Sequence, residues 1–587
     1  MIRQDKRNLK NGIKTYIRVT EGYRPSPGAK PKQRTVKSFG YLEDQDDPKA
    51  FMKEVEEFNK GLNRVERIVQ HYDMDEKMND ENNRIQNYGY MYLNSIYNIL
   101  KIDEFVDSYV YREKLRIKYD LKSIIRYLVI QRIMNPASKR RTLYEGIDLY
   151  EFCPKISYDE LCRSLDIVSS MGNELQAHTR KALDEFMPVD HTYAYYDLTN
   201  YFFEIDCEDE AEEDLRHRGV SKEHRVDPIV ELSLVMDANG CPLQVETHPG
   251  NTSESTTVIP VMNKVKETLG LQRLILVADK GLNTTKNIDY LQNNGDGYVF
   301  SQIVKGTRGR RFLKYIEDKS DWTVVSHRYR FRLFTEEFNG KDENGNAVIR
   351  KRKVLLYWTL ERALRDQHKR EEKICKANKA DINKVYGLSH GYGDLFNEHL
   401  INKQTGEVLE NTKRIKTLNE EKIESLELYD GVNCIITGEL DYDENKIREV
   451  YGNLWMIEDA FRISKTNLSA RPVFLQTKNH INAHFLLCFM SVLILRIIKF
   501  KMGNDHLTVE RLQKVLNKCN LIEAKHGLLY FLPVLRSQNI ITDKKLDNDD
   551  NIECDFDKLQ RSFNTSFEKK YLKKEDFKNI ILNMSIA

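Results

Sequence analysis

The chain has 587 residues and a mass of 69.1 kDa, which exceeds the size of one ordinary domain and predicts about two to four domains. Hydrophobic residues make up 40% and charged residues 31%, a balance that excludes a disordered or fibrous chain. The formal net charge is only +2, and the 9 scattered cysteines include no CxxC pair, which argues against a disulfide framework or zinc ribbon and favours a reducing compartment.

The N-terminal 188 residues are predicted to form two regions. Residues 1–75 contain alternating apolar and polar residues around the turn "RPSPGAKPK", which predicts a basic β-hairpin, and a charged helix is expected over residues 47–71. Residues 76–188 have apolar residues at spacings of three and four, as in "LKSIIRYLVIQRIM". We interpret this second region as a helical DNA-binding region.

Residues 189–303 are richer in aromatic and β-branched residues, which favour β-strands. "HTYAYYDLTNYFFEID" predicts a strand, and "PIVELSLVMDANGCPLQVETH" predicts two strands around an Asn-Gly turn. A helix near 254–269, the strand "RLILVAD", another helix and the strand "YVFSQI" follow. This order predicts a mixed α/β sheet, and the acidic stretch "EDEAEED" within it is interpreted as a solvated loop.

The C-terminal half is predicted to contain three parts. Residues 304–432 are basic and β-like with interleaved aromatic residues, which fits either a groove for a DNA backbone or a solvated β surface. Residues 433–500 return to the α/β pattern and contain the most apolar stretch, "AHFLLCFMSVLILRII", which is predicted to be a buried helix because charged residues end it below membrane-spanning length. Residues 501–587 are predicted to be helical.

Two aspartates occupy strand ends in this pattern. Asp197 follows "YAYY" and Asp279 follows "LILVA", so each lies where an apolar strand meets a polar loop. A single aspartate in such a place is usually a turn or cap residue. Two of them favour a functional site, because open α/β sheets present ligand-binding residues at the ends of their strands.

The segment "YGNLWMIEDAFRISK", residues 451–465, is predicted to form one helix. Its polar face gathers a carboxylate with an aromatic residue and two cations: Tyr451, Glu458, Arg462 and Lys465. One interpretation is an ordinary surface helix whose Glu458 and Arg462 pair across one turn. The other is a site in which the cations hold DNA phosphates beside a catalytic glutamate.

Asp197, Asp279 and Glu458 are the candidate catalytic and metal-binding residues. Three carboxylates without a nearby His or Cys cluster suit Mg²⁺ or Mn²⁺ better than zinc. Two such ions held about 4 Å apart can activate a water or a 3′-hydroxyl and stabilise the leaving oxygen of a phosphodiester. The sequence therefore predicts a two-metal nuclease or strand-transfer site.

These motifs resemble the DDE transposases of bacterial insertion sequences, in particular the insertion-sequence-four type with the signature Y-x2-R-x3-E-x6-K. Tyr451, Glu458 and Lys465 match the signature, whereas Leu454 stands at its Arg position, for which Arg462 is the candidate replacement. "YYDLTNYFFE", "HPGNTSES", "VADKGLNTTKNI" and "IEDAFRISKTNLSARPVF" extend the resemblance over roughly residues 85–500.

The resemblance implies a fold and an activity. It implies an RNase H-like core with Asp197 on its first strand, Asp279 after its fourth and Glu458 on a late helix, interrupted by a β-rich insertion domain at 304–432 and flanked by N-terminal and C-terminal helical regions. It also implies cleavage at the ends of an insertion sequence, followed by joining of the 3′-hydroxyls to target DNA with two Mg²⁺ or Mn²⁺ ions. Lys280, Tyr451, Arg462 and Lys465 are the predicted DNA contacts.

The expected partners are double-stranded DNA, as terminal inverted repeats and target, and a second copy of the chain in a paired-end homodimer. We expect a cytoplasmic, nucleoid-associated bacterial protein with no membrane partner. Two alternatives stay open: an RNase H-like nuclease or resolvase that cleaves branched DNA, and a domesticated DNA-binding protein without catalytic activity. The presence of all three carboxylates counts against the second alternative.

Overall fold

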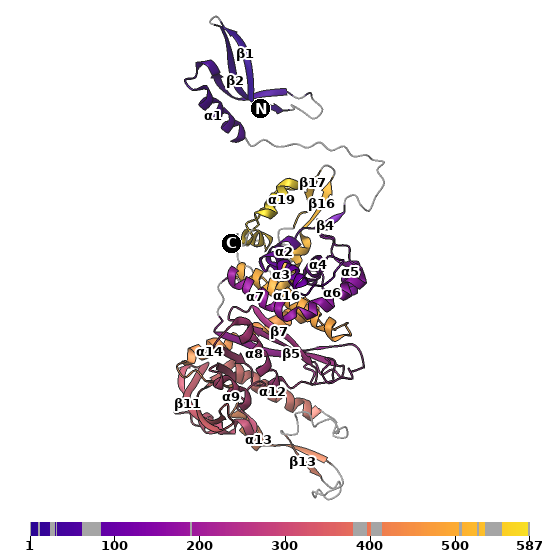
Figure 1. The fold of residues 1–587 in the computed structure, drawn as a ribbon. Helices are drawn as coiled ribbons and strands as arrows, with labels where there is room; N and C mark the ends of the chain where they lie inside the picture. The colour runs from indigo at the N-terminus through magenta and orange to yellow at the C-terminus, as the bar shows by residue number, and fades with distance from the viewer. Residues whose placement is uncertain are drawn as a thin grey trace. The chain divides into compact units, whose positions relative to one another are not determined.

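The computed structural model describes residues 2–9, 12–23, 30, 32–61, 84–187, 191–379, 396–400, 414–503, 507–524, 527–534 and 555–584. The chain divides into two compact units, Met1–Asn79 and Asp80–Ala587. Figure 1 shows the elements of each unit in chain order. The predicted boundary near residue 75 is close to this division, whereas the boundaries predicted inside the second unit stay a prediction.

The first unit is a three-stranded antiparallel sheet with one helix. Its elements are β1 (Ile2–Leu9), β2 (Gly12–Tyr23), β3 (Lys32–Tyr41), a short 3₁₀ turn (Leu42–Asp44) and α1 (Pro48–Gly61). Ile17, Val19 and Val55 form its small core between sheet and helix. The predicted hairpin is thus present as β2 and β3, β1 was not predicted, and the second half of the predicted helix lies outside the described residues.

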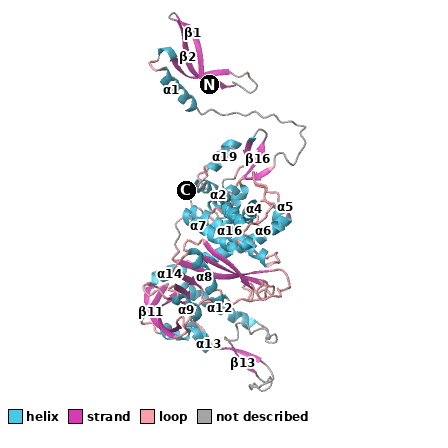
Figure 2. Ribbon diagram, in the orientation of Figure 1, coloured by secondary structure: helices cyan, strands magenta, loops and turns pink. Residues whose placement is uncertain are grey.

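A nine-stranded sheet forms the centre of the second unit, in the order β10-β11-β12-β15-β9-β8-β5-β6-β7 (Figure 2). The half of the sheet that carries Asp197 comprises β5 (Tyr193–Phe202), β6 (Ile229–Met236), β7 (Pro242–Pro249), β8 (Ile275–Ala278) and β9 (Gly297–Ser301). Strands β5, β6 and β7 form an antiparallel meander, and β8 and β9 join in parallel on the other side of β5. Counted from β5, Asp197 lies on the first strand and Asp279 directly follows the fourth, as an RNase H-like core implies.

The sheet has a core on each face because successive side chains of a strand point to opposite sides. From β5, Tyr193, Tyr195 and Tyr201 enter the core shared with the helical layer. Tyr196 and Leu198 enter the second core, which α8 (Val258–Leu269) and α9 (Thr285–Asn293) cover. A 3₁₀ turn, Glu254–Thr256, precedes α8.

A layer of helices packs on the first face of the sheet (Figure 1). It contains α2 (Tyr90–Ile99), α3 (Ile102–Arg112), α4 (Leu121–Met134), α5 (Lys139–Glu145), α6 (Tyr158–Ser170), α7 (Gly172–Phe186) and α16 (Lys478–Lys501). Among the described residues, α16 is the one helix long and apolar enough to cross a membrane, yet 94% of its apolar window is buried inside the protein. The prediction of a buried helix for this stretch is therefore confirmed.

The segment predicted as a separate β-rich insertion extends the same sheet. It contributes α10 (Gly306–Gly309), a 3₁₀ turn (Arg310–Phe312), α11 (Leu313–Glu317), β10 (Thr323–Ser326), β11 (Tyr329–Lys341), β12 (Ala347–Thr359), α12 (Leu360–Lys379), β13 (Phe396–Leu400), β14 (Arg414–Leu418) and α13 (Glu420–Glu427). Strand β12 pairs with β15 (Val432–Thr437), which pairs with β9. The long helix α12 was not predicted.

The C-terminal region is not wholly helical, which corrects the prediction for residues 501–587. Besides α17 (Val509–Lys518), α18 (Asp555–Ser562) and α19 (Lys574–Leu582), it contains β16 (Asn520–Ala524), β17 (Leu528–Phe531) and β18 (Tyr571–Lys573). These strands form a small sheet with β4 (Ile85–Asn87). Apolar runs this short cannot be assigned to helix or strand by periodicity alone.

Candidate active site

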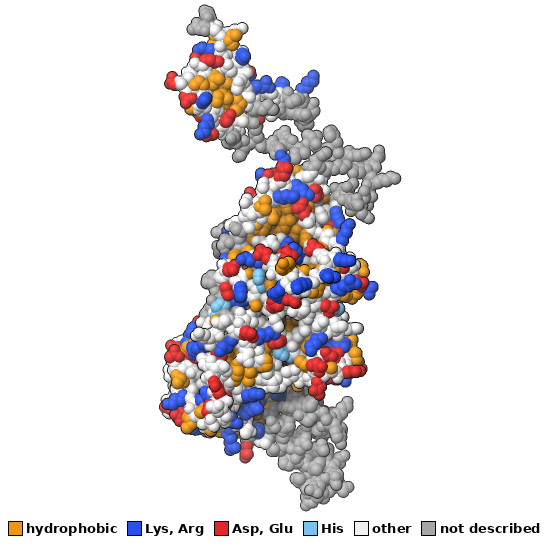
Figure 3. Space-filling model, viewed as in Figure 1, with side chains coloured by type: hydrophobic (Ala, Val, Ile, Leu, Met, Phe, Trp, Pro, Cys, Tyr) orange, Lys and Arg blue, Asp and Glu red, His pale blue; other side chains and the backbone are white. Residues whose placement is uncertain are grey.

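Asp197 and Asp279 occupy neighbouring positions on two parallel strands: Asp279 directly follows β8, whereas Asp197 is the fifth residue of β5 and not at its end, which corrects the prediction for Asp197. In the register of β5 and β8, Tyr196 is paired with Ala278, so the two aspartates occupy the next position on each strand. Figure 3 shows basic and acidic side chains interspersed on the visible face of the second unit, so surface charge alone does not mark this site. The strand register identifies the site, because it brings together two aspartates that are distant in the sequence.

The Asp197 carboxylate is held in a partly desolvated place. Its Oδ1 accepts a hydrogen bond from the backbone N–H of Leu198 at 2.8 Å. Burial raises the pKa of Asp197 to about 6, the Lys222 ammonium and the backbone N–H of Leu198 oppose that rise, and the negative charges of Glu254 and Asp279 add to it. The site therefore concentrates carboxylates, a property typical of cation-binding sites.

The Asp279 carboxylate is oriented by two hydroxyl groups. Ser301 Oγ donates to Asp279 Oδ1 at 2.5 Å, and Tyr451 Oη donates to the same oxygen at 3.3 Å. Burial raises the pKa of Tyr451 above its ordinary value, so this phenol keeps its proton and remains a donor. Asp279 thus links the end of β9 to the segment that carries the predicted glutamate.

Residues 451–465 do not form one continuous helix, which corrects the prediction. Helix α14 (Glu444–Gly452) ends just after Tyr451, a turn at Asn453 follows, and α15 (Trp455–Arg462) continues into a π-helical turn, Ile463–Asn467. Gly and Asn are weak helix formers, which explains the interruption. Tyr451, Glu458 and Lys465 consequently belong to three successive elements.

Lys465, one of the predicted DNA contacts, is mostly buried and contacts β5. Its Nζ donates to Thr199 Oγ1 at 2.7 Å, and 13% of its side chain is exposed. Burial lowers the pKa of Lys465 to about 8, an effect that the Lys222 charge reinforces and the charges of Glu231 and Asp197 oppose. Thr199 lies two positions after Asp197, so Lys465 anchors the π-helical turn beside that aspartate.

The other predicted DNA contacts lie at the surface. Arg462 is 61% exposed and forms an ion pair with Asp459, which also pairs with Arg496 at 2.9 Å. Lys280 is exposed directly after Asp279. Leu454, at the signature's Arg position, is 8% exposed and belongs to the core.

Glu458 lies between the two anchors of this segment but apart from the aspartate pair. Tyr451 binds Asp279 on one side of Glu458, and Lys465 binds Thr199 on the other. The Glu458 side chain is exposed and makes no hydrogen bond or ion pair with another described residue. Within the described ranges, which contain all three predicted carboxylates, no three His, Cys, Asp or Glu side chains are grouped closely enough to hold a metal ion.

Three charged residues of the site were missed by the sequence analysis: Lys222, Glu231 and Glu254. Lys222 Nζ donates to the backbone carbonyl of Leu198 at 2.5 Å and pairs with Glu254 at 3.3 Å. Glu231 lies opposite Asn200 on β6 and is 5% exposed, and burial raises its pKa to about 7. The signal for Glu231 was a single acid inside the apolar strand "IVELSLVM".

The comparisons with known families give two matches. Residues 214–494 match the model of the transposase DDE domain, and residues 2–70 match the N-terminal domain of the IS1634 family of transposases. The DDE match includes Asp279 and Glu458 and begins after Asp197. A search of curated proteins found no match.

Solved transposase structures show weak similarity. The piggyBac transposase synaptic complex with hairpin DNA is 7% identical, with a TM-score of 0.27, over 68% of this chain and 76% of that chain. The Mos1 transposase paired-end complex with left transposon end is 13% identical, with a TM-score of 0.14, over 43% of this chain and 68% of that chain. With a transposase DDE domain behind an insertion-sequence transposase N-terminal domain, this chain is a DDE transposase.

Proposed function

We propose that this transposase cleaves DNA at the ends of its insertion sequence and joins the freed 3′-hydroxyls to target DNA at Asp197 and Asp279, with Glu458 as the third carboxylate. The observation that carries the proposal is the juxtaposition of Asp197 and Asp279 by the parallel register of β5 and β8. Asp197 belongs to β5 and Asp279 directly follows β8, so the pairing of these two strands sets the separation of the carboxylates.

The aspartate pair fits a divalent cation. Two neighbouring carboxylates supply hard oxygen donors, and their mutual repulsion favours a shared cation. Asp197 and Asp279 would hold Mg²⁺ or Mn²⁺, two ions in the full site. Bound there, such ions activate the attacking water or 3′-hydroxyl and stabilise the leaving oxygen.

The segment around Glu458 supports a role for this residue as the third carboxylate. Tyr451 and Lys465 attach the segment to Asp279 and to Thr199, so Glu458 lies between two contacts to the catalytic strands. We assign these residues to the Y-R-E-K signature of the insertion-sequence-four type, with Arg462 in place of the missing arginine. Glu458 must turn toward the aspartates when DNA binds.

The proposed substrate is double-stranded DNA, both at the terminal inverted repeats and at the target. Exposed Lys280 and Arg462 are the candidate phosphate contacts next to the carboxylates, because Lys and Arg side chains at the surface position a DNA backbone. The proposed assembly is a homodimer that holds the two ends of the insertion sequence together. Localisation to the bacterial cytoplasm and nucleoid follows from this substrate.

The test combines purified full-length chain, Mg²⁺ and labelled duplexes that carry the inverted repeats flanking the gene. We expect nicks at the repeat ends and, with a target plasmid, joined products that require a 3′-hydroxyl. A duplex with scrambled repeats is the control. Cleavage of branched DNA without preference for the repeats would indicate the nuclease or resolvase alternative, and no cleavage would indicate a DNA-binding protein.

Removing the hydroxyl groups that orient Asp279 is expected to slow cleavage. Tyr451→Phe and Ser301→Ala each delete one hydrogen bond to a charged carboxylate, which predicts a loss of about 10-fold. Single-turnover cleavage rates, measured over a range of Mg²⁺ concentrations, check this. Tyr442→Phe is the matched control, because the Tyr442 hydroxyl bonds Tyr193 at 2.9 Å instead. Equal rates for Tyr451→Phe and Tyr442→Phe would contradict the orienting role.

A further inference from the structure

Two cations beside the aspartate strands share one internal carboxylate. Glu223 Oε1 lies 3.8 Å from Lys465 Nζ and also forms an ion pair with the guanidinium of Arg471. The three side chains are at most 30% exposed, so the cluster is largely withdrawn from solvent. Lys465 comes from the π-helical turn after α15, and Arg471 lies in the linker between that turn and α16, seven residues before Lys478, the first residue of α16.

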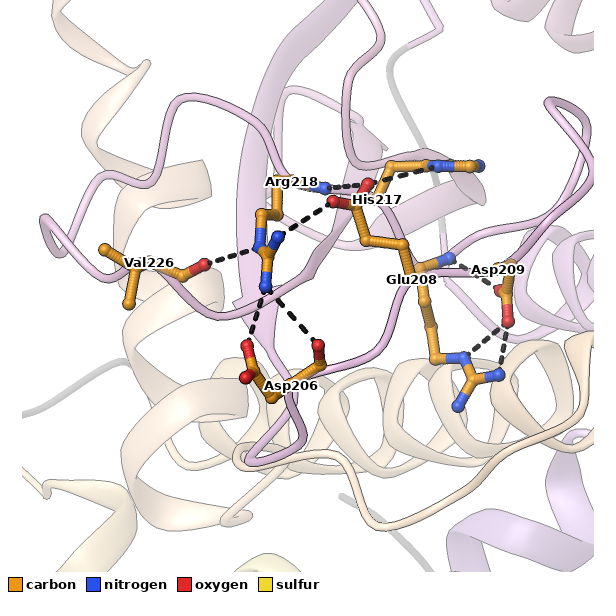
Figure 4. Close-up of polar contacts among 7 residues, drawn as sticks. Asp206, Glu208, Asp209, His217, Arg218 and Val226 are labelled. Carbon is orange, nitrogen blue, oxygen red and sulfur yellow. Dashed lines mark hydrogen bonds and ion pairs between the residues drawn. The ribbon is translucent and has the colours of Figure 1, made fainter.

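Glu223 belongs to the connection between β5 and β6, residues 203–228. Figure 4 shows how ion pairs and hydrogen bonds fold this connection onto itself: Arg218 pairs with Asp206 at 2.6 Å and with Glu208 at 3.5 Å, and its Nε donates to the carbonyl of Val226 at 3.3 Å. Asp209 accepts from the backbone N–H of Arg216 at 2.9 Å. The connection is therefore held together by its own ion pairs and hydrogen bonds, while most acids of the stretch "EDEAEED" are exposed, as predicted.

The two residues before Glu223 hold it in position. Ser221 Oγ accepts a hydrogen bond from the Glu223 backbone N–H at 3.3 Å. Lys222 is attached to the carbonyl of Leu198 and to Glu254, so residues 221–223 are fixed to β5 next to Asp197. Glu223 thus places a negative charge beside Lys465, whose ammonium contacts Thr199, two positions after Asp197.

The Glu223 carboxylate occupies a position that a phosphate of the DNA substrate could take. A phosphodiester that is attacked at Asp197 and Asp279 brings neighbouring phosphates along the adjoining protein surface. Carboxylate and phosphate oxygens are equivalent acceptors for Lys and Arg, and Arg in particular binds both in a forked geometry. Partly buried cations also require an anion nearby, because an unpaired buried charge is costly.

We propose that Lys465 and Arg471 form a binding site for a phosphodiester of the DNA strand, and that Glu223 competes with the DNA for this site. This inference rests on the proposed function, because that function supplies DNA as the ligand. Binding of DNA releases the Glu223 carboxylate to solvent and leaves the two cations paired with phosphate. Arg471 is thereby assigned a DNA contact that the sequence analysis did not identify.

Direct measurement of DNA affinity tests the competition. Wild type, Glu223→Gln and Glu212→Gln are titrated, as full chains, into a fluorescent duplex carrying one inverted repeat, in EDTA so that catalysis does not interfere. Glu223→Gln is expected to bind about 10-fold more tightly than wild type, because the competing anion is gone. Glu212→Gln changes the net charge equally at an exposed position of the same connection, and it is expected to stay within about 2-fold of wild type.

Two further variants test whether the tighter DNA binding of Glu223→Gln depends on Arg471. Arg471→Gln alone is expected to weaken binding several-fold and to reduce the slope of affinity against salt by about one phosphate contact. Glu223→Gln combined with Arg471→Gln is expected to lose most of the gain seen with Glu223→Gln. Thermal melting of each variant verifies the fold, and Arg471→Gln remains decisive if Glu223→Gln proves unstable.

The proposal is overturned if Glu223→Gln binds like wild type or like Glu212→Gln, or if Arg471→Gln leaves both affinity and salt slope unchanged. Glu223 would then only fasten the β5–β6 connection. These outcomes differ from failure of the proposed function, which appears as wild type binding the inverted repeat no better than a scrambled duplex and cleaving neither.

Discussion

Asp197→Asn and Asp279→Asn are each expected to lower strand cleavage and strand joining by about 10³-fold or more while DNA binding is retained. An amide removes one negative charge from the pair that the strand register brings together. Loss of several kcal/mol of cation binding and transition-state stabilisation corresponds to a rate effect of this size. Cleavage of labelled inverted-repeat duplexes, together with binding to the same duplexes, measures both properties.

The control for this experiment is Asp107→Asn on α3, whose side chain is 62% exposed and pairs with Lys122 at 2.7 Å. It is expected to cleave like wild type. Retention of more than about a tenth of the activity by either active-site variant would show that the pair does not carry the chemistry, since such a loss corresponds to barely 1.4 kcal/mol.

Glu458→Gln decides which residue is the third carboxylate. If Glu458 turns toward the aspartates on DNA binding, the variant is expected to lose activity as completely as Asp279→Asn. Glu254 is the alternative, because its charge acts on Asp197 and it pairs with Lys222 at the same strand end. Full activity of Glu458→Gln together with loss of activity in Glu254→Gln would transfer the role to Glu254.

Strands β5 to β9 could be predicted because their residue preferences agree with the α/β order of the surrounding elements. β5, β6 and β7 are rich in aromatic and β-branched residues, and the Asn-Gly turn between β6 and β7 gives Gly240 a φ of 76°, a conformation that glycine adopts without strain. Both aspartates were identifiable as acids at the ends of apolar runs. The side-by-side placement of those runs required only a parallel sheet.

Other parts of the structure depend on contacts between distant segments, which no local pattern records. Strands β10, β11 and β12 of the 304–432 segment were predicted to belong to a separate domain, but β15 links them to β9 in one continuous sheet, whereas β13 and β14 pair in a sheet of their own. The small sheet formed by β4 and β16–β18 joins residues from both ends of the second unit. Pairings of this kind become visible only in the folded chain.

In the candidate site, too, the sequence identified charged residues but not the distant residues that they contact. A helical wheel places Lys465 on an exposed polar face, because a wheel ignores the break after Tyr451 and the π-helical turn. The acidic β5–β6 connection resembles a solvated loop by composition, yet Glu223 is paired with two cations from a segment more than two hundred residues later. Charge composition identifies which residues ionise but not which partners they meet.

Asp197→Asn is also expected to stabilise the protein at neutral pH. The folded chain holds the pKa of this carboxyl at about 6, against an ordinary value of 3.8, mainly because the group is buried. Between about pH 4 and pH 6 the unfolded chain has released this proton while the folded chain retains it, so stability falls as the pH rises through this window. Above pH 6 the full destabilisation, about 3 kcal/mol, is present.

Melting temperatures in metal-free buffer at pH 7.5 and pH 4 check the sign of this effect. Asp197→Asn is expected to melt about 2–4 °C higher than wild type at pH 7.5, and at the same temperature as wild type near pH 4. Mg²⁺ should narrow the difference at pH 7.5, because a cation that binds the folded wild type stabilises it. Glu458→Gln, at an exposed position, should leave both temperatures unchanged. A gain of equal size at the two pH values would mean that burial of the Asp197 charge is not its cause.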